Sequence, residues 1–358
     1  MDIGELRAQI DDIDRKIVEL LRRRAQVAVE IGRLKRQNGA GGFDPVRESV
    51  VLESVARMET EPLTPKAVQA VFSEIISACR ALEETLRVAF LGPQHTFSHL
   101  AAVRRFGREA EYIDCASVTE VFEAVERGRA GVGVVPVENS LAGAVPETLD
   151  CFLRTALQIV GEHYERIEHC LLGVGPVEKI RTIYTQPHAE AQCRRWLREH
   201  FPQADLIPQP STAAAARAAA EAGETAAAIG PAAAARPYGL EVLERGIEDD
   251  SRNWTRFFII GRGRTTPTSK DKTSLVFSVP HRAGSLHEAL TPLRDHKVNM
   301  TMIQSRPVPG RLWTYAFFVD IEGHQEDPAI SQALEELRAR ASDFAILGSY
   351  PAAQEPEG

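Results

Sequence analysis

Apolar side chains in residues 1–36 recur at spacings of three and four, which predicts one long amphipathic helix. The stripe consists of Leu6, Ile10, Ile13, Ile17, Leu20, Val27, Ile31 and Leu34. Three cations interrupt or flank it. Arg24 and Lys35 lie about 16 Å apart along the axis and within about 20° around it, so their side chains can converge. Arg7 lies about 25 Å from Arg24, so a second copy of the helix must supply Arg7 if all three bind one anion.

Two further helices are predicted after a glycine-rich break at residues 39–42. Asp44 and Thr64 are each followed by proline, which combines an N-cap residue with the residue favoured at the first helical position. The third helix is expected to end near Leu86. Three helices, one of them very long, cannot bury the apolar stripe within one chain, so we expect a dimer.

Residues 87–263 change to short apolar runs separated by helical stretches, a pattern typical of an α/β fold. The predicted strands are residues 87–91, 132–135, 180–185, 206–207, 226–229 and 257–260. The alanine-rich residues 213–220 predict a packed helix, because alanine has the highest helix propensity.

Residues 263–272 are polar with Gly and Pro and predict a linker. The rest follows the order strand, helix, strand, strand, helix, strand, which is ferredoxin-like. Its clearest strands are residues 273–279 and 312–321, its clearest helices residues 285–296 and 328–341, and the tail from residue 352 is expected to fray. We therefore predict a multidomain chain with domains at residues 1–86, 87–263 and 272–350.

Composition narrows the class of protein. The formal net charge of −8 argues against a general nucleic-acid or membrane-surface binder, so local cation clusters indicate small anionic ligands. The N-terminus is charged from its second residue and no apolar run reaches membrane-spanning length, so a cytoplasmic protein is expected. Five scattered cysteines suggest reduced thiols, and ten histidines show no metal-ligand spacing, so no metal is predicted.

The helical segment carries a set of polar residues that could bind a dicarboxylate, because arginine binds carboxylates bidentately. The set is Arg7, Arg24, Lys35, Asp44, Arg47, Glu48 and Glu83. Taken alone, the same residues could be a solvated helix face with ordinary ion pairs.

This segment resembles the all-helical chorismate mutases. The resemblance rests on the runs LRAQIDDIDRKIVELLRRRAQVAVEIGRLK and FDPVRE. It implies an active site between intertwined protomers. By position, Arg7 matches the arginine donated by the partner, Arg24, Lys35 and Arg47 match the remaining cations, Asp44 and Glu48 match the substrate-hydroxyl region, and Cys79 stands where many relatives have Ser.

The implied reaction is the pericyclic rearrangement of chorismate to prephenate, without proton transfer or a covalent step. Catalysis then comes from holding the substrate and stabilising charge on the breaking ether oxygen. Lys35 can donate a hydrogen bond to that oxygen. Glu83, where relatives have Gln or Glu, can donate only when protonated.

Four polar patches stand out in the α/β segment, each of which could also be ordinary turn and cap chemistry. They are Thr96, Phe97 and Ser98 at a predicted helix start, Glu138, Asn139 and Ser140 after a buried strand, Thr185 with Gln192, and Thr255, Arg256 and Phe257 before the last strand.

Together the patches resemble prephenate dehydratase. The family's Val-Pro-Ile-Glu-Asn-Ser motif is nearly intact at residues 135–140, and Thr-Arg-Phe is intact at residues 255–257. The resemblance implies a site lined by Glu138, Asn139, Ser140, Gln192 and Thr255, with Thr255 protonating the leaving hydroxyl, Arg256 binding carboxylate and no cofactor.

Two departures from the family's pattern bear on this activity. Gln94 and His95 replace a Glu-Gly pair, so His95 costs strain if the lost glycine had a positive φ. Thr185 begins Thr-Gln-Pro-His, where the family has Ser-His-Pro-Gln, and keeps a hydroxyl.

The last segment resembles an ACT regulatory domain, in which paired domains bind L-phenylalanine between them. The residues that carry or flank its two signatures are His281, Gly284, Ser285, Leu286, Asn299, Gln304, Ser305, Arg306 and Pro307. A domain that pairs without binding an amino acid is the alternative.

The whole chain thus resembles the bifunctional chorismate mutase–prephenate dehydratases of phenylalanine biosynthesis. The implied partners are chorismate, prephenate, L-phenylalanine as inhibitor, and a second or further copy of the chain, with no nucleic acid or membrane. Two alternatives stay open. The second domain could act on arogenate, or the mutase could be fused to a non-catalytic phenylalanine sensor of periplasmic-binding type.

Overall fold

A computed structural model describes residues 2–37, 43–308, 310–311 and 313–356. The chain divides into two compact units. The first holds residues 1–87 with 103–111, and the second holds residues 88–102 with 112–358. Each unit is described by itself.

The first unit is built on three helices, α1 (Ile3–Gln37), α2 (Pro45–Ala56) and α3 (Pro65–Glu83). The two predicted caps form: the Asp44 carboxylate accepts from the Arg47 amide at 2.9 Å, and the Thr64 hydroxyl from the Ala67 amide at 3.2 Å. Helix α3 ends slightly before the predicted end near Leu86. The predicted break at residues 39–42 lies outside the described residues.

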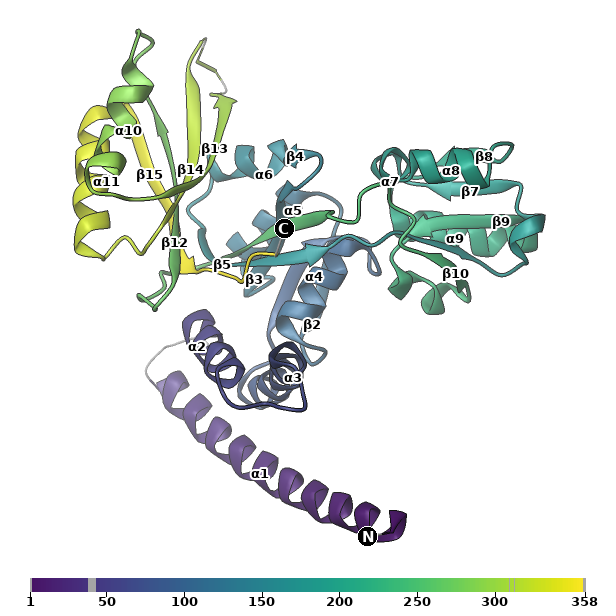
Figure 1. Cartoon of the computed structure of the whole chain (residues 1–358). Coiled ribbons are helices and arrows are strands. Elements are labelled where there is room, and N and C mark those ends of the chain that lie inside the picture. The colour runs from purple at the N-terminus through teal and green to yellow at the C-terminus, as the bar shows by residue number, and fades with distance from the viewer. Residues whose placement is uncertain (1, 38–42, 309, 312, 357–358) are drawn as a thin grey trace. The chain divides into compact units, whose positions relative to one another are not determined.

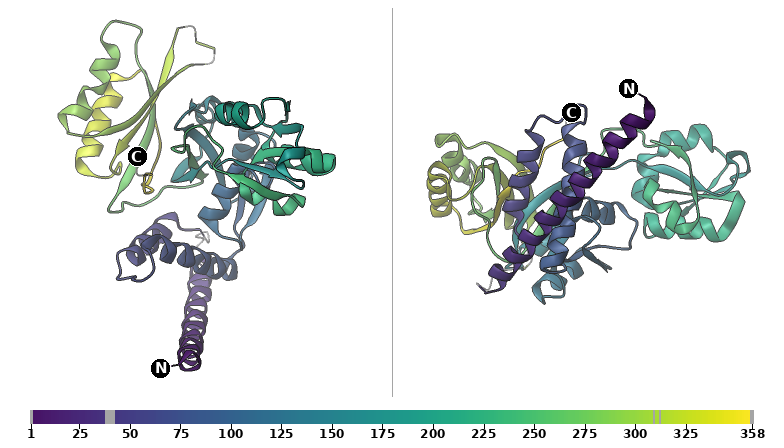
Figure 2. Two further views of the ribbon diagram at one scale, coloured as in Figure 1. Left: turned by 45° about the vertical axis from the view of Figure 1, so that its right-hand side comes forward. Right: turned by 90° about the horizontal axis from the view of Figure 1, so that it is seen from below.

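The apolar stripe of α1 is exposed within this unit. Its eight residues range from 44% exposed at Ile31 to 61% at Leu20. Helix α1 buries Ala28 and Gly32, near its C-terminal end, and Figure 2 shows the rest of it extending beyond α2 and α3. A single chain therefore leaves the stripe uncovered, as the sequence predicted.

The second unit begins with a mixed sheet in the order β2-β1-β3-β11-β5, with β4 paired to β3 (Figure 1). Its strands are β1 (Arg87–Leu91), β2 (Glu111–Cys115), β3 (Val132–Asn139), β4 (Gly143–Ala144), β5 (Gln158–Arg166) and β11 (Trp254–Gly261). Helices α4 (Phe97–Phe106), α5 (Val118–Glu126) and α6 (Pro146–Phe152) connect these strands, and the last turns of α4 belong to the first unit. Strand β3 pairs in parallel with β1, and β11 pairs antiparallel with both β3 and β5.

The chain leaves this sheet after β5, builds a second sheet, and returns as β11. The second sheet has the order β10-β6-β9-β7-β8. Its elements are β6 (Cys170–Gly173), β7 (Thr182–Thr185), α7 (Pro187–Gln192), α8 (Arg194–His200), β8 (Asp205–Pro208), α9 (Thr212–Ala222), β9 (Ala226–Gly230) and β10 (Glu241–Arg245). The alanine-rich run forms α9 as predicted, and its buried alanines allow close packing on β9.

A third, four-stranded sheet has the order β13-β14-β12-β15. Its elements follow the predicted order: β12 (Asp271–Ser278), α10 (Ser285–Asp295), β13 (Met300–Pro307), β14 (Tyr315–Glu322), α11 (Pro328–Arg340) and β15 (Asp343–Pro351). Helices α10 and α11 pack on one face around Phe277, Leu293 and Leu334. Strand β14 starts later than predicted, and Leu312 lies outside the described residues.

The other face of this third sheet packs against the first sheet. Val276, Phe318 and Tyr350 share one buried apolar cluster with Ile159 and Phe258. A Cβ atom at Gly348 would lie 2.2 Å from the Ile159 carbonyl oxygen, so β15 can approach β5 closely only because residue 348 is glycine. No described helix is long and apolar enough to span a membrane.

Candidate functional sites

Asn139, at the end of β3, is the centre of a polar network on the first sheet of the second unit. Its side-chain amide donates to the Asn253 side-chain carbonyl at 2.8 Å, the Trp254 carbonyl at 3.1 Å and the Thr255 hydroxyl at 3.0 Å. Its own side-chain carbonyl accepts from two backbone amides of the following turn, Leu141 and Ala142. Asn139 is therefore held in one orientation, and it reaches Thr255 because β3 and β11 are paired neighbours.

The network continues onto the second sheet. The Asn253 amide donates to Gln192 Oε1 at 2.9 Å, and His169 Nε2 lies 2.8 Å from the same oxygen. Phe97, from the start of α4, packs edge-on against His169 with ring centroids 5.3 Å apart. The structure thus brings together predicted residues from all four patches, namely Phe97, Asn139, Gln192 and Thr255.

His169 is a network member that the sequence analysis missed. It is 2% exposed, and burial lowers its pKa despite opposing effects of the Gln192 hydrogen bond and the Glu248 charge. Because Gln192 Oε1 can only accept, Nε2 carries the proton of the neutral ring. His169 Nδ1 is buried without a hydrogen-bond partner among the described residues. A buried acceptor of this kind can receive a hydrogen bond from a bound ligand.

Other predicted residues hold the backbone around this network. The Ser140 hydroxyl donates to the Arg252 carbonyl at 2.9 Å and accepts from the Trp254 amide at 3.0 Å. The Thr96 hydroxyl donates to the Pro93 carbonyl at 2.9 Å, and the buried Thr185 hydroxyl donates to a carbonyl 3.3 Å away. Ser98 lies in the first turn of α4, and Phe257 is buried within β11.

Glu138 and Arg256 are directly opposite each other on β3 and β11, and therefore point to one face of the sheet. Thr255 and Asn139 form the neighbouring pair and point to the other face. No hydrogen bond to the Glu138 carboxylate is found within the described part of the chain.

The Arg256 side chain is buried and bound by other residues of the chain. It is 5% exposed, and its guanidinium donates to Glu162 at 2.7 Å, Asp320 at 2.5 Å and Tyr350 at 3.1 Å. Its donors are thus engaged on the face opposite Thr255. The Arg256 guanidinium therefore does not face the Asn139 network, because neighbouring residues in a strand face opposite ways, and carboxylate binding by Arg256 stays a prediction.

His95 has a φ of +65°, the left-handed conformation expected if the family's glycine is needed there. Its amide donates to His99 Nδ1 at 3.1 Å. Its ring packs edge-on against His99 and against Tyr238, with centroids 5.5 Å and 5.9 Å apart, and Tyr238 ends a short 3-10 helix just before β10 of the second sheet. His95 therefore adds a contact between the two sheets.

In the first unit, the end of α1 packs closely on the end of α3. Lys35 Nζ lies 3.4 Å from Glu83 Oε2, and Arg36 donates to the Glu83 carbonyl at 2.6 Å. A Cβ atom at Gly32 would lie 2.8 Å from Glu83 Cγ, so glycine permits this approach. Two predicted site residues, Lys35 and Glu83, are thus neighbours.

The other predicted residues of the first unit are more dispersed. Glu48 is buried, and its two carboxylate oxygens are bound by Arg80 and, at 3.1 Å, by Arg105. Asp44 is the N-cap of α2. Cys79 is buried, Arg24 is partly exposed, and Arg7 and Arg47 are exposed. Within one chain Arg7 cannot reach Arg24, since about 25 Å of helix separates them.

The predicted regulatory residues occupy two regions of the third sheet. Gly284, with φ +82°, precedes α10, and the Ser285 hydroxyl in its first turn is buried without a partner among the described residues. In β13, Arg306 makes two hydrogen bonds to Asp150, at 3.0 Å and 2.7 Å. The remaining predicted residues are His281 and Leu286 beside the first region, Asn299 just before β13, and Gln304, Ser305 and Pro307 within it.

Three family models match the chain in order. They are chorismate mutase type II over residues 6–84, prephenate dehydratase over residues 88–265 and the ACT domain over residues 273–339. A bifunctional chorismate mutase/prephenate dehydratase from Aquifex aeolicus is 40% identical over 357 residues, which cover 98% of each chain. The chain belongs to the bifunctional chorismate mutase/prephenate dehydratase family.

Two solved structures similar to the chain each cover about three quarters of it. A prephenate dehydratase from Arthrobacter aurescens in complex with L-Phe is 35% identical, with a TM-score of 0.69, over 74% of this chain and 90% of that one. A structure described as a novel type of quorum quenching acylase is 37% identical, with a TM-score of 0.68, over 75% of this chain and 98% of that one.

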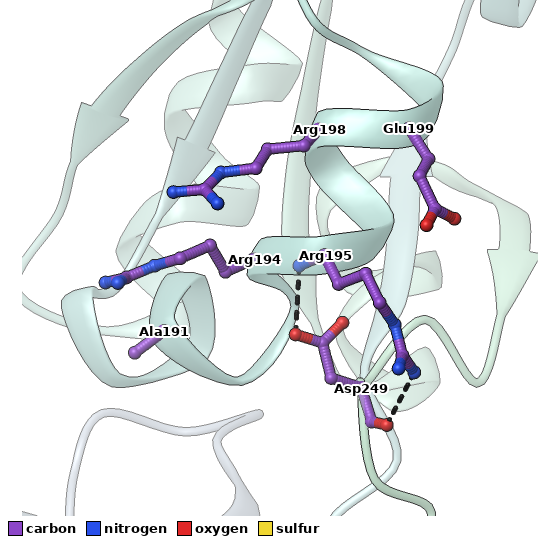
Figure 3. A pocket seen from close by; sticks show the side chains of 6 residues that line it. All are labelled: Ala191, Arg194, Arg195, Arg198, Glu199 and Asp249. Carbon is purple, nitrogen blue, oxygen red and sulfur yellow. Dashed lines mark hydrogen bonds between the residues drawn. The ribbon is translucent and has the colours of Figure 1, made fainter.

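A separate pocket of about 460 Å³ lies beside α7 and α8. Figure 3 shows its lining residues Ala191, Arg194, Arg195, Arg198, Glu199 and Asp249. The Asp249 carboxylate accepts from the Arg195 and Trp196 amides and so fixes the start of α8. None of the predicted site residues of this family lines the pocket. Among the described residues, no three His, Cys, Asp or Glu side chains gather as metal ligands.

Proposed function

We propose that the protein catalyses both reactions named by its family and is inhibited by L-phenylalanine. The mutase domain at residues 1–86 rearranges chorismate to prephenate, the dehydratase domain at residues 87–263 converts prephenate to phenylpyruvate, and the ACT domain at residues 272–350 regulates the second step. The observation that carries this proposal is the match of all three family models in order, together with a bifunctional relative over 98% of the chain.

The mutase site is proposed to lie between two intertwined helical protomers. One protomer supplies Arg24, Lys35 and Glu83, and its partner supplies Arg7. The exposed stripe of α1 supports this arrangement, because a second copy would bury it. Lys35 is placed to stabilise negative charge on the ether oxygen, and the Lys35–Glu83 contact holds its ammonium.

The dehydratase site is proposed to use Thr255 as proton donor in a two-lobed, periplasmic-binding-like domain. The Asn139 amide donates to the Thr255 oxygen, which leaves the hydroxyl hydrogen free to be donated. In the reaction the carbon–carboxylate bond breaks, its electron pair completes the aromatic ring, and the ring hydroxyl departs. A proton from Thr255 lets that hydroxyl leave as water, and no cofactor is needed.

Gln192 and His169 are proposed to hold the substrate in this site. Gln192 Oε1 is saturated by His169 and Asn253, so Gln192 can offer its amide hydrogens. His169 Nδ1 can accept from a substrate hydroxyl. Glu138 faces the other side of β3 and is assigned a supporting role at that strand end.

The ferredoxin-like ACT domain is proposed to bind phenylalanine at the start of α10. The Ser285 hydroxyl is buried there without a partner in the part of the chain that the structure describes, which costs free energy until a ligand accepts or donates a hydrogen bond. Gly284 lets the chain turn in the left-handed conformation beside it.

A coupled assay tests the proposal: purified protein receives chorismate, and phenylpyruvate is followed with and without phenylalanine. We expect phenylpyruvate to form and phenylalanine to reduce it. A Thr255→Val variant keeps the shape of the side chain but not its hydroxyl, so prephenate should accumulate instead. Prephenate accumulating in the wild type would refute the dehydratase assignment, and arogenate turnover to phenylalanine would identify the alternative substrate.

A further inference from the structure

A buried polar cluster joins the dehydratase sheet to the ACT sheet directly behind Thr255. Arg256 of β11 binds Glu162 of β5 on its own sheet, and Asp320 of β14 and Tyr350 of β15 on the ACT sheet. Its guanidinium also lies 4.8 Å from the centroid of the Phe258 ring. These contacts hold the Arg256 side chain in place. Because its partners lie on β5 of the dehydratase sheet and on β14 and β15 of the ACT sheet, Arg256 links the two sheets.

The ACT side of the cluster is itself internally bonded. Ser274 donates to Asp320 at 2.5 Å and lies 2.7 Å from the Tyr350 hydroxyl. Asp320 and Tyr350 are both fully buried. A buried carboxylate that loses its cation is strongly unfavourable, so Asp320 and Arg256 must stay together.

A second cation closes the cluster. Lys272 Nζ lies 3.3 Å from Glu162, 3.2 Å from the Tyr164 hydroxyl and 2.6 Å from Glu355. The amide of Ala353 donates to Glu162 at 3.0 Å. The described part of the C-terminal tail is therefore bound to the junction and not frayed, which corrects the prediction from the sequence.

Arg256 stays charged and Tyr350 stays neutral around neutral pH. Burial by itself lowers the pKa of the Arg256 guanidinium, but its hydrogen-bond partners raise it above its usual value. Burial and the Asp320 charge raise the pKa of Tyr350, which therefore remains a neutral phenol. The cluster is thus a fixed electrostatic contact.

We propose that Arg256 is a positioning residue for the dehydratase reaction, held by Asp320 and Tyr350 of the ACT domain. Thr255 and Arg256 are neighbours in β11, so a shift of Arg256 on one face moves Thr255 on the other. The β3–β11 register is irregular between Arg256 and Phe257, and such bulges adjust the aim of nearby side chains. Through this contact the ACT domain controls the aim of the proton donor.

Met302 extends the contact toward the predicted phenylalanine site. Its sulfur lies 3.9 Å from the Arg256 guanidinium, and it shares β13 with Gln304 and Arg306 of the second ACT signature. A ligand that shifts β13 can therefore act on Arg256 directly. This inference rests on the proposed dehydratase function and adds the route by which its regulation acts.

The test compares Asp320→Asn with the matched control Asp343→Asn in the full chain. Both carboxylates belong to the ACT domain and each accepts from a serine hydroxyl, but Asp343 pairs with the exposed Arg311 and lies outside the cluster. We expect Asp320→Asn to lower kcat for prephenate about tenfold with KM changed less than about twofold, since misplacing a catalytic group slows chemistry without weakening uniform binding. The residual activity should not respond to phenylalanine, whereas Asp343→Asn should behave as the wild type.

Intrinsic tryptophan fluorescence of the same samples reports whether the second unit is folded, because all three tryptophans of the chain, Trp196, Trp254 and Trp313, belong to it. If Asp320→Asn fails to fold, Tyr350→Phe decides, because it keeps the ring and removes only the hydroxyl that binds Arg256; the same loss of kcat is expected, to a smaller degree. Unchanged kcat in the folded variant, or a raised KM with unchanged kcat, overturns the inference while leaving the dehydratase function standing. A wild type that does not turn over prephenate overturns both.

Discussion

The proposed sharing of the mutase site between two protomers makes a quantitative prediction about mixed subunits. Arg7→Ala and Arg24→Ala proteins should each lack mutase activity, because each removes one cation from every site. In a mixed dimer one site carries both substitutions and the other carries neither. With equal amounts and random exchange, half of the dimers are mixed, so about a quarter of all sites are intact and about a quarter of wild-type activity returns.

The physical basis lies in the exposed face of α1. Burying a Leu, Ile or Val side chain completely contributes about 1.5–3 kcal/mol, so each half-exposed stripe residue can contribute on the order of 1 kcal/mol in a dimer. Eight such residues per chain give ample reason for α1 to be covered by a second copy. Arg7 lies on the same helix, so the proposed pairing would also place Arg7 at the partner's site.

The assay follows chorismate consumption after the two proteins are mixed and exchange is confirmed by mass spectrometry of differently tagged subunits. Arg24→Ala mixed with Lys35→Ala is the matched control. Both side chains come from one protomer, so every site of that mixed dimer lacks one cation and no activity should return. No recovery in the first mixture despite confirmed exchange, or equal recovery in both, would refute the shared site.

Three further predictions address single residues. Glu83→Gln should keep mutase activity at least at the wild-type level, because the Gln amide donates a hydrogen bond without an added proton; much slower chorismate turnover in a folded Glu83→Gln protein would contradict this. His95→Gly should change the free energy of unfolding, measured by denaturant titration, by less than about 1 kcal/mol. The substitution relieves about 1–2 kcal/mol of strain from the left-handed backbone at residue 95. This gain is offset by the loss of the ring contacts and by about 0.5–1 kcal/mol from the greater conformational entropy of glycine in the unfolded chain. His95→Asn is its control. Burial lowers the pKa of His169, so the unfolded chain is protonated at a higher pH than the folded chain. The free energy of unfolding should therefore fall as the pH drops below about 6.5. His169→Gln should make this fall with pH shallower, and an unchanged dependence on pH would exclude the effect.

Local signals predicted much of the fold. The caps at Asp44 and Thr64 and the apolar period of α1 depend on neighbouring residues, so they could be read directly. Strands β2 and β10, with sequences EYIDC and EVLER, were missed because their polar residues hide the apolar alternation. Strand β5 was missed for the same reason, and β6 because it is short.

The candidate site was predicted less completely because its members meet only through folding. His169 contacts Gln192, a distant residue in sequence, and its environment depends on which strands neighbour each other. A histidine before the run Cys-Leu-Leu-Gly was the available signal, but nothing local distinguishes it from an ordinary core residue. Asn253 was not among the predicted site residues, and it contacts both Asn139 and Gln192 only because the chain folds the ends of β3 and α7 close to it.

Arg256 shows how the role of a motif residue depends on strand geometry. The Thr-Arg-Phe motif places two polar residues next to each other. Resemblance to the family suggests that both belong to the same site. In a strand, however, successive side chains face opposite sides, so Thr255 and Arg256 cannot both face the Asn139 network. One strand between β3 and β5 can thereby present a proton donor on one face and a regulatory contact on the other. The same two-fold period assigns Glu138 to the Arg256 face and Asn139 to the Thr255 face. For motif residues in a strand, the face of the sheet to which each side chain points should therefore be determined before a catalytic or binding role is assigned to it.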